Sequence, residues 1–166
     1  QQMVVIISRV FEVMDEEVVI QDRPTAKRLE KVRGRVVFDN VSFKYSEAGD
    51  HVLRDLDFRV TPGMSLAVVG PSGAGKSTLV NLLLRLYEPS EGRVLLDDYD
   101  LRDIRLSSLR QHISVVPQEP VLFSGTIAEN IVYGREGATP ERVMRAATAA
   151  ELHDYVMTLA EKYEAR

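Results

Sequence analysis

A glycine-rich loop near the middle of the chain constrains the fold more than any other feature. Residues 70–78 read Gly-Pro-Ser-Gly-Ala-Gly-Lys-Ser-Thr and fill every fixed position of the pattern G-x-x-x-x-G-K-[ST]. The apolar segment 65–69 precedes the loop, and leucines recur at helical spacing after Lys76. We therefore expect a buried strand, an anion-binding loop and an amphipathic helix, in that order.

The residue types in the loop suit the phosphates of a nucleotide. Glycines let the backbone wrap an anion closely, and the helix N-terminus adds a partial positive charge. A lysine at a helix N-terminus is unfavourable unless an anion compensates it, so an ordinary glycine turn explains Lys76 poorly. We expect Lys76 to reach the β- and γ-phosphates and the Ser77 hydroxyl to coordinate Mg²⁺. The predicted binding residues of the loop are Gly70, Pro71, Ser72, Gly73, Ala74, Gly75, Lys76, Ser77 and Thr78.

The composition narrows the classes of function. With 45% hydrophobic and 28% charged residues the chain has the composition of a soluble globular domain, and its net charge of −4 gives no general attraction to nucleic acid. The absence of cysteine excludes disulfides, thiolate zinc sites and cysteine nucleophiles. The longest apolar run, residues 3–7, is far shorter than the roughly 20 residues of a membrane helix.

Three regions follow one another along the chain. Residues 1–17 carry apolar side chains at near-helical spacing, which is typical of a helix leaving a larger apolar neighbour or of a terminal helix of the same domain. Residues 18–34, which include Pro24 and several charges, have the composition of a connector. Residues 35–166 are expected to form the folded domain.

Apolar periodicity predicts both strands and helices in this domain. Strands are expected at residues 36–43, 53–60, 93–96 and 113–116, the first two paired antiparallel. Besides the helix after the loop, helices are expected at residues 106–111, 126–131, 140–150 and 152–163. Thr139 is the expected N-cap of the third of these, and Pro140 suits its first position.

Stretches on both sides of the loop resemble one known family. They are Val-Val-Phe-Asp-Asn-Val-Ser-Phe-Lys-Tyr at 36–45, Leu-Leu-Arg-Leu-Tyr-Glu-Pro-Ser-Glu-Gly at 83–92, and the segment 115–131 with Pro-Gln-Glu-Pro and Phe-Ser-Gly-Thr-Ile. Over nearly its whole length the chain resembles an ATP-binding cassette (ABC) domain of the exporter type. The resemblance implies an α/β, P-loop NTPase-like cassette in partial form. It comprises an antiparallel β subdomain, an incomplete parallel core sheet with flanking helices, and the start of the helical subdomain.

The resemblance also assigns residues outside the loop. It implies that Tyr45 stacks on adenine, that Val52 packs near the same base, and that Gln118 contacts Mg²⁺ or the attacking water, so that Ser77 and Gln118 are the candidate metal ligands. By residue type alone, Tyr45 is more typical of a strand-end tyrosine with its hydroxyl in water, and Gln118 is also typical of a surface loop. Residues 123–131 match the stretch with which exporters contact a coupling helix of the membrane domain.

Two further matches are misleading. Residues 94–98, Val-Leu-Leu-Asp-Asp, resemble the acidic strand that holds Mg²⁺, but in the family their position belongs to the peripheral antiparallel sheet. Ser124 and Gly125 resemble a fragment of the Leu-Ser-Gly-Gly-Gln signature without its second glycine and glutamine. We assign neither a catalytic role.

The resemblance implies an ATPase that drives transport across a membrane. The cofactors would be ATP and Mg²⁺. The partners would be a second nucleotide-binding domain, as a homodimer or heterodimer, and the coupling helices of a transmembrane domain, with no nucleic acid. Residues 1–17 would be the end of the last transmembrane helix or a cytoplasmic extension, and residues 18–34 a linker. The expected location is the cytoplasmic face of the cell membrane.

The family's signature motif, acidic metal strand with its general-base glutamate, and switch histidine are expected after Arg166. We therefore assign no catalytic residue, and we expect the chain by itself to bind MgATP weakly without turnover. The alternatives are a soluble ABC-type ATPase of nucleic-acid repair or translation, a P-loop kinase of small metabolites, and a catalytically inactive nucleotide-binding module.

Overall fold

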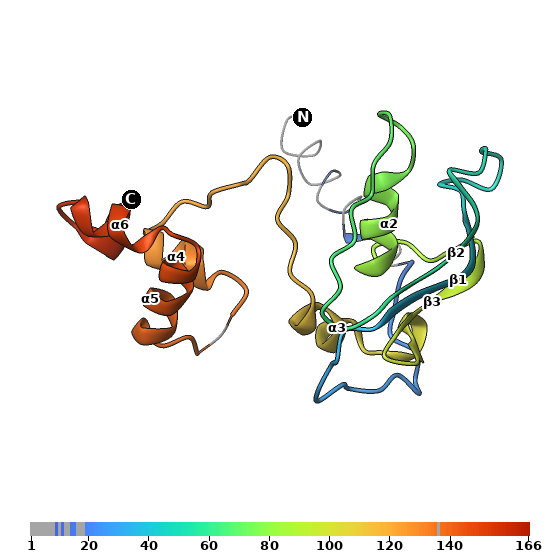
Figure 1. The fold of residues 1–166 in the computed structure, drawn as a ribbon, viewed down its shortest axis with the longest axis horizontal. Coiled ribbons are helices and arrows are strands. Elements are labelled where there is room, and N and C mark those ends of the chain that lie inside the picture. The colour runs from blue at the N-terminus through green and yellow to red at the C-terminus, as the bar shows by residue number, and fades with distance from the viewer. Residues whose placement is uncertain (1–8, 10, 12–13, 16–18, 136) are drawn as a thin grey trace. The chain divides into compact units, whose positions relative to one another are not determined.

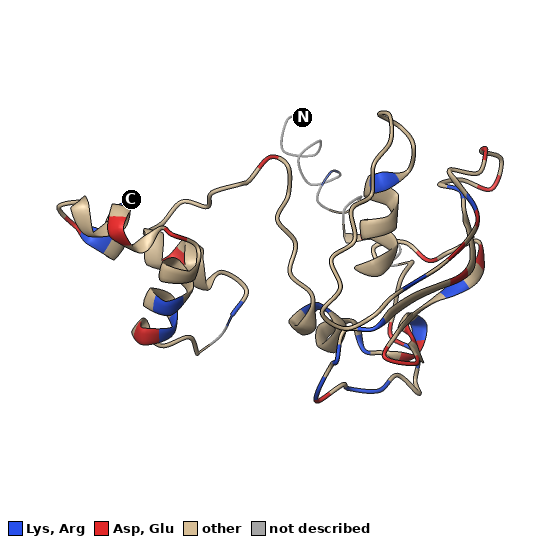
Figure 2. Ribbon diagram, in the orientation of Figure 1, with Lys and Arg blue, Asp and Glu red and all other residues tan. Residues whose placement is uncertain are grey.

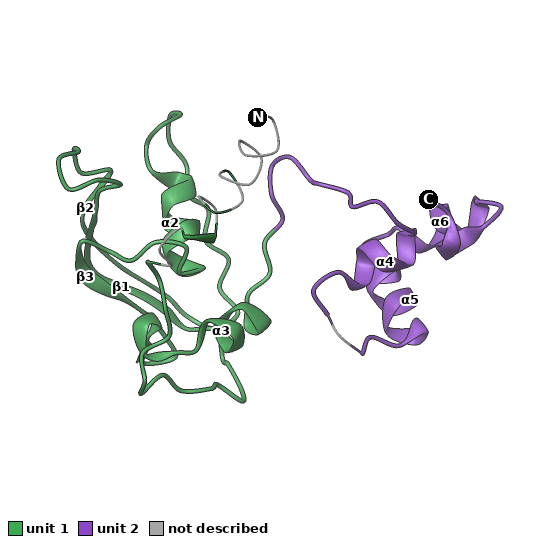
Figure 3. Cartoon of the chain, turned by 180° about the vertical axis from the view of Figure 1, so that it is seen from behind, with its two compact units in different colours: residues 1–115 green, residues 116–166 purple. Residues whose placement is uncertain are grey.

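The chain divides into two compact units, Gln1–Val115 and Val116–Arg166, which are coloured separately in Figure 3. The computed structural model describes residues 9, 11, 14–15, 19–135 and 137–166. Most of the apolar segment predicted to be helical at the N-terminus lies outside the described residues. Within the described part of the chain, no helix has the length and apolarity that crossing a membrane requires.

A four-stranded antiparallel sheet forms the centre of the first unit (Figure 1). Its strands are β1 (Val36–Phe43), β2 (Leu53–Val60), β3 (Glu91–Leu96) and β4 (Tyr99–Asp100), in the order β2-β1-β3-β4. The predicted antiparallel pairing of the first two strands is confirmed, and the third begins two residues earlier than predicted. In this register Phe38 lies between Phe58 and Val94, and the two phenylalanine rings stack 4.7 Å apart.

A bulge in β1 makes a glycine necessary in β3. The register between the two strands shifts between Asp39 and Ser42, and Asn40 has a φ of 49°. Gly92 has a φ of 77°, and a Cβ at this position would lie 2.2 Å from the carbonyl oxygen of Asn40. Any side chain at position 92 would therefore collide with the backbone of β1.

Two helices and the sheet share one apolar core. Helix α2 (Lys76–Leu83) contributes Leu82, and α3 (Leu106–His112) contributes Leu109. Between β4 and α3 lies the 3-10 helix η1 (Leu101–Asp103). The buried members of this cluster are Leu29, Phe38, Val41, Phe43, Leu53, Leu82, Val94, Leu96, Leu101, Ile104 and Leu109. The helix predicted after the loop is confirmed, and its leucines provide the face that anchors it to the sheet.

Two predicted strands are wrong. Residues 65–69 and 113–116 form no strand, and the first segment is exposed rather than buried, with Val69 88% exposed. A strand is stable only when its backbone N–H and C=O groups pair with a neighbouring strand. Among the described residues the only parallel pairing is an isolated bridge between Lys27 and Ile104. The parallel core sheet is therefore not formed among the described residues. The apolar side chains of residues 65–69 and 115–116 are exposed, whereas Ile113 packs against the core.

The connector is hydrogen-bonded to the helices of the first unit. The backbone N–H of Lys27 donates to Asp103, and that of Arg105 donates to Lys27. The Ser108 hydroxyl accepts from the N–H of Leu29 at 2.9 Å and lies 3.2 Å from its carbonyl oxygen. These contacts hold the described part of residues 18–34 against η1 and α3. The role of this segment as a linker between domains stays a prediction.

The second unit is helical. It contains α4 (Ile127–Val132), α5 (Pro140–Ala149), α6 (His153–Thr158) and the 3-10 helix η2 (Lys162–Glu164). Thr126 and Glu129 form a capping box at the start of α4. Thr139 is the N-cap of α5 and Pro140 occupies its first turn, as predicted, although the Thr139 side chain makes no capping hydrogen bond. The single helix predicted for residues 152–163 is divided into α6 and η2.

Candidate functional site

The glycine-rich loop passes directly into α2. Gly75 is the N-cap of the helix and has a φ of 83°, a conformation that glycine adopts without steric cost. A Cβ at this position would lie 2.7 Å from Cδ2 of Leu53 and 3.3 Å from Cγ1 of Val52. Gly75 therefore lets the loop lie against the start of β2. Residues 70–74 are exposed, and no described side chain caps the N-terminal N–H groups of α2.

Lys76 is an isolated cation at this helix N-terminus. It is the only charged residue between Arg59 and Arg85, which is visible in Figure 2 as one blue segment at the start of α2. Its Nζ lies 2.9 Å from the carbonyl oxygen of Gly70 and 2.6 Å from that of Pro71. The ammonium thus lies across the loop, bonded to neutral acceptors that an anion could replace.

The two hydroxyl residues after Lys76 have different surroundings. Ser77 is exposed, whereas Thr78 is 4% exposed and its Oγ1 lies 2.9 Å from the phenolic oxygen of Tyr45. Magnesium retains several waters and uses one or two protein oxygens, so an exposed hydroxyl suits it. The structure leaves Ser77 accessible for such a role and engages Thr78 with another side chain.

Tyr45 and Val52 lie beside the loop. Tyr45 follows β1, is 52% exposed, and reaches α2 through its hydroxyl. The backbone N–H of Val52 donates to the carbonyl oxygen of Phe43 at 2.8 Å. The Val52 side chain lies next to Gly75. The structure therefore brings together the predicted phosphate-binding and base-binding residues of the first unit. Their roles in binding stay predictions.

Gln118 belongs to the second unit. It is exposed and lies in a bend of the segment that leads to α4. Its predicted contact with Mg²⁺ or water stays a prediction.

Asp97 has a structural role, in keeping with the assignment of residues 94–98 to the peripheral sheet rather than to a metal site. It follows β3, and its carboxylate accepts hydrogen bonds from the backbone N–H groups of Arg33, Gly34 and Arg35. Burial opposes ionisation of this carboxyl. The three N–H donors and the positive charge of Arg33 together outweigh that effect and hold the pKa of Asp97 below its usual range.

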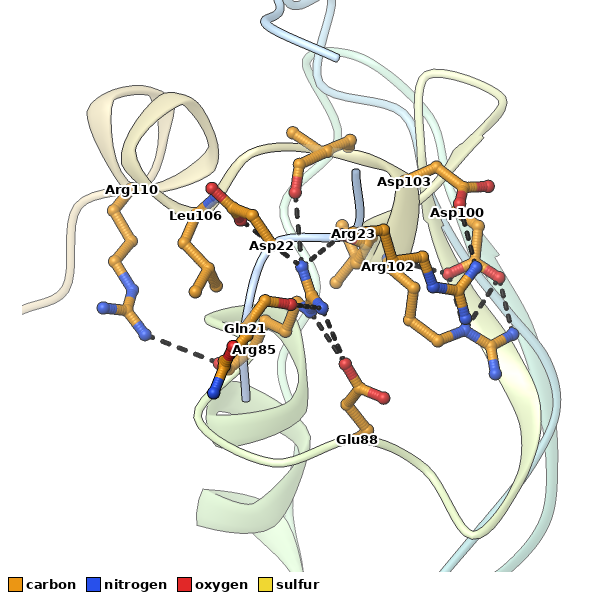
Figure 4. Close-up of polar contacts among 12 residues, drawn as sticks. Gln21, Asp22, Arg23, Arg85, Glu88, Asp100, Arg102, Asp103, Leu106 and Arg110 are labelled. Atoms are coloured by element: carbon orange, nitrogen blue, oxygen red, sulfur yellow. Dashed lines mark hydrogen bonds and ion pairs between the residues drawn. The ribbon is translucent and has the colours of Figure 1, made fainter. Parts of the chain in front are cut away.

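Sequence reasoning missed the residue that holds the other end of α2. Arg85 is 2% exposed, and Figure 4 shows its guanidinium surrounded by acceptors. It donates to Oε1 of Glu88 at 3.0 and 2.8 Å, and to the carbonyl oxygens of Gln21, Leu101 and Ile104 at 3.0, 3.4 and 3.3 Å. We call these five residues the Arg85 network. A charged residue within the apolar run Leu-Leu-Arg-Leu is the sequence signal of such a buried arginine.

Sequence reasoning also missed the surroundings of Tyr45. Its ring lies edge-on to those of Phe43 and Tyr87, with centroids 4.9 and 5.1 Å away. Tyr87 lies in the turn after α2, and no local pattern indicates that it meets Tyr45. This contact is possible only because the sheet and the turn pack together.

Known proteins resemble the chain closely in sequence. It is 47% identical over 153 residues to human "ATP-binding cassette sub-family B member 6", covering 92% of this chain and 18% of that protein. It is 43% identical over 165 residues to "Putative multidrug export ATP-binding/permease protein YgaD" of Bacillus subtilis (strain 168), covering 99% of this chain and 28% of that protein. The chain thus spans less than a third of the length of either relative.

A solved structure gives the corresponding likeness in three dimensions. It is described as "Structure of a bacterial Atm1-family ABC exporter with ATP bound", and it matches 98% of this chain and 29% of its own with a TM-score of 0.85 and 41% identity. This likeness confirms the predicted cassette fold. The family described as "ABC transporter" matches residues 53–165, which are more than half of the sequence. The chain therefore belongs to the ABC transporter family.

Proposed function

We propose that the chain supplies the phosphate- and adenine-binding part of an ATP site in an exporter that couples ATP binding and hydrolysis to transport across a membrane. The observation that carries this proposal is Lys76 at the N-terminus of α2, which among the described residues is bonded to carbonyl oxygens of its own loop alone. Because the helix dipole disfavours a cation there, the arrangement becomes favourable when an anion lies between the ammonium and the helix.

The loop residues fit a triphosphate. Gly73 has a φ of 80°, and a Cβ added to it would meet no atom within 4 Å, so its backbone is open to a ligand. The N–H groups of the first turn of α2 and the Lys76 ammonium would share the phosphate oxygens. Ser77, with Gln118 as a second ligand, would hold Mg²⁺, which neutralises phosphate charge when bound. Tyr45 and Val52 would contact the base.

Turnover requires groups that we do not assign to these 166 residues. Phosphoryl transfer depends on positioning and on electrostatic stabilisation of the transition state, and we expect the metal acid, the general base and the signature motif to be supplied elsewhere. We therefore propose that the chain by itself binds MgATP weakly and does not hydrolyse it, while the whole protein is an ATPase.

The proposed partners are a second nucleotide-binding domain and the coupling helices of a transmembrane domain. Residues 123–131 would contact a coupling helix. In this region Phe123 and Tyr133 are exposed, and their rings stack 3.9 Å apart at 17°. Exposed paired aromatic rings are typical of surfaces that bind other proteins. The corresponding location is the cytoplasmic face of a cell membrane.

The test is a titration of the chain with a fluorescent ATP analogue, with and without Mg²⁺. We expect metal-dependent binding that is weakened by Lys76→Ala and by Tyr45→Ala. The matched control is Lys31→Ala, which removes an exposed lysine of the connector and is expected to leave binding unchanged. Equal binding by the Lys76→Ala and Lys31→Ala variants would overturn the proposed site. ATP hydrolysis by the chain above the rate of the Lys76→Ala variant would overturn the proposed lack of turnover.

A further inference from the structure

Tyr45 makes a hydrogen bond and two aromatic contacts with other residues of the chain. Stacking on a base requires none of these contacts. Its phenolic oxygen is 2.9 Å from Oγ1 of Thr78, and its ring is nearly perpendicular to that of Tyr87, at 89°. Phe43 is a second edge-on neighbour, at 83°. Edge-to-face contacts of this kind favour one ring orientation because of the aromatic quadrupole.

The Thr78 hydroxyl ties the phenol to the phosphate loop. Thr78 is the third residue of α2 and its side chain is buried, so its hydroxyl is fixed by the helix. Tyr45 is half exposed, and exposed side chains otherwise change rotamer on a picosecond to nanosecond scale. The hydrogen bond between them therefore joins the position of the ring to that of the helix that begins at Lys76.

Tyr87 is fixed relative to β1 by the turn that contains it. The backbone N–H of Ser90 donates to the carbonyl oxygen of Ser42 at 2.9 Å, and the Ser90 hydroxyl accepts from the N–H of Lys44 at 3.2 Å. These two bonds hold the turn after α2 beside the end of β1. The Tyr87 ring consequently meets Tyr45 from a backbone that is anchored on the same strand.

We propose that Thr78 and Tyr87 are positioning residues for the recognition of the nucleotide base. They hold the Tyr45 ring in one orientation at a set distance from the phosphate loop. The ring can then stack on the base of a nucleotide while the loop binds the triphosphate of the same molecule. The inference rests on the proposed function, since the ring must stack on a base. Ordering a side chain before binding removes a cost of about two- to tenfold in affinity per side chain.

The test compares two ligands that differ in the base. Dissociation constants for ATP and for inorganic tripolyphosphate are measured by calorimetry on the 166-residue chain. The dissociation constant for tripolyphosphate divided by that for ATP is the ratio that reports the contribution of the nucleoside. We expect Tyr45→Phe, which keeps the ring, and Thr78→Val, which replaces the hydroxyl by a methyl group, each to reduce the ratio about two- to tenfold. Thr78→Ser should restore the ratio, and Tyr87→Leu should lower it by a similar factor.

The Tyr45→Phe/Thr78→Val double variant separates positioning from a direct phosphate contact. If the two hydroxyls act as a pair, the double variant has the same ratio as either single variant, because the second substitution removes nothing further. An unchanged ratio in Tyr45→Phe, or independent losses that multiply in the double variant, would overturn the inference. If Thr78→Val does not fold, Tyr45→Phe and Tyr87→Leu carry the test.

The Lys76→Ala variant distinguishes failure of this inference from failure of the proposed function. If Lys76→Ala weakens both ligands while Tyr45→Phe, Thr78→Val and Tyr87→Leu leave the ratio unchanged, the phosphate site stands and only the positioning roles fail. If Lys76→Ala weakens neither ligand, the proposed function fails and the inference fails with it.

Discussion

The two ends of helix α2 are held in different ways. At its C-terminal end the buried guanidinium of Arg85 is hydrogen-bonded to the Glu88 carboxylate and three carbonyl oxygens, and it also forms an ion pair with Asp22. At its N-terminal end Lys76 is bonded, within the described part of the chain, to just the carbonyl oxygens of Gly70 and Pro71, which are exposed. One end is thus part of the folded interior, and the other presents polar groups to solvent.

This difference separates stability from binding along a single helix. Polar groups in the interior lose much free energy when a partner is removed, because water cannot replace it. Polar groups at the exposed end can exchange one partner for another at little cost. We therefore expect the loop, which leads into a helix anchored in the core, to bind the proposed anion without rearrangement of the core. Four predictions test this comparison, from the largest expected effect to the smallest.

The largest effect is expected from removing the buried charge. Arg85→Met keeps much of the side-chain volume but removes the guanidinium hydrogen bonds to Glu88 and to the carbonyl oxygens of Leu101 and Ile104 from the interior. We expect the free energy of unfolding to fall by about 3 kcal/mol, measured by urea denaturation. The matched control Arg28→Met, at an exposed position of the connector, should change it by less than about 0.5 kcal/mol. Equal losses in the two variants would show that the buried network contributes no special stability.

The opposite pattern is expected at the other end of α2. Lys76→Ala removes hydrogen bonds that water can replace, so the unfolding free energy should change by less than about 0.5 kcal/mol. Affinity for MgATP should fall roughly 10- to 100-fold, since charge-assisted hydrogen bonds contribute about 1.5–3 kcal/mol. The comparison is broken if Lys76→Ala destabilises the chain as much as Arg85→Met does.

A third prediction concerns the contact between the loop and β2. Gly73 and Gly75 both have a left-handed backbone conformation. The Cβ added by Gly75→Ala would lie 2.7 Å from Leu53, whereas the Cβ added by Gly73→Ala, at a φ of 80°, would have no atom within 4 Å. The left-handed backbone alone costs roughly 1–2 kcal/mol in each variant. Thermal unfolding should therefore show a greater loss for Gly75→Ala, and the difference isolates the packing against β2. Equal losses would mean that β2 does not restrict the loop.

The smallest effect is expected at acid pH, where Asp97 holds the connector. Burial raises the pKa of this carboxyl, but the backbone N–H bonds and the charge of Arg33 outweigh that effect, so the pKa is lowered in the folded chain. Its contribution to stability is therefore present above the unfolded pKa of about 3.9 and is lost as the pH falls through the lower folded value.

Urea denaturation between about pH 7 and about pH 3 tests this contribution against Asp97→Asn. The difference in unfolding free energy between the unmodified chain and the variant should be constant near neutral pH and should shrink below about pH 4. A difference that is the same at every pH would mean that ionisation of Asp97 does not stabilise the attached connector.

Sequence reasoning succeeded where a local pattern carries the information. The loop, the first two strands and α2 were predicted because alternation, leucine spacing and glycine placement act over a few residues. It failed for residues 65–69, whose apolar composition indicated a buried strand although no described segment pairs with them. Strand formation depends on a hydrogen-bonding neighbour that a local pattern cannot specify.

Among the candidate site residues, the sequence by itself predicts the glycine-rich loop and the anion-binding chemistry that we propose for it. A lysine after glycines at the start of an amphipathic helix is most simply explained by an anion-binding site, because the helix dipole and backbone N–H groups both favour an anion there. The tertiary structure decided which other side chains reach this helix. The hydrogen bond of Tyr45 to Thr78, the edge contact of Tyr87, and the burial of Arg85 join segments far apart in sequence. Such contacts depend on how the sheet, α2 and the connector pack, because only packing brings distant polar and aromatic groups within range of one another.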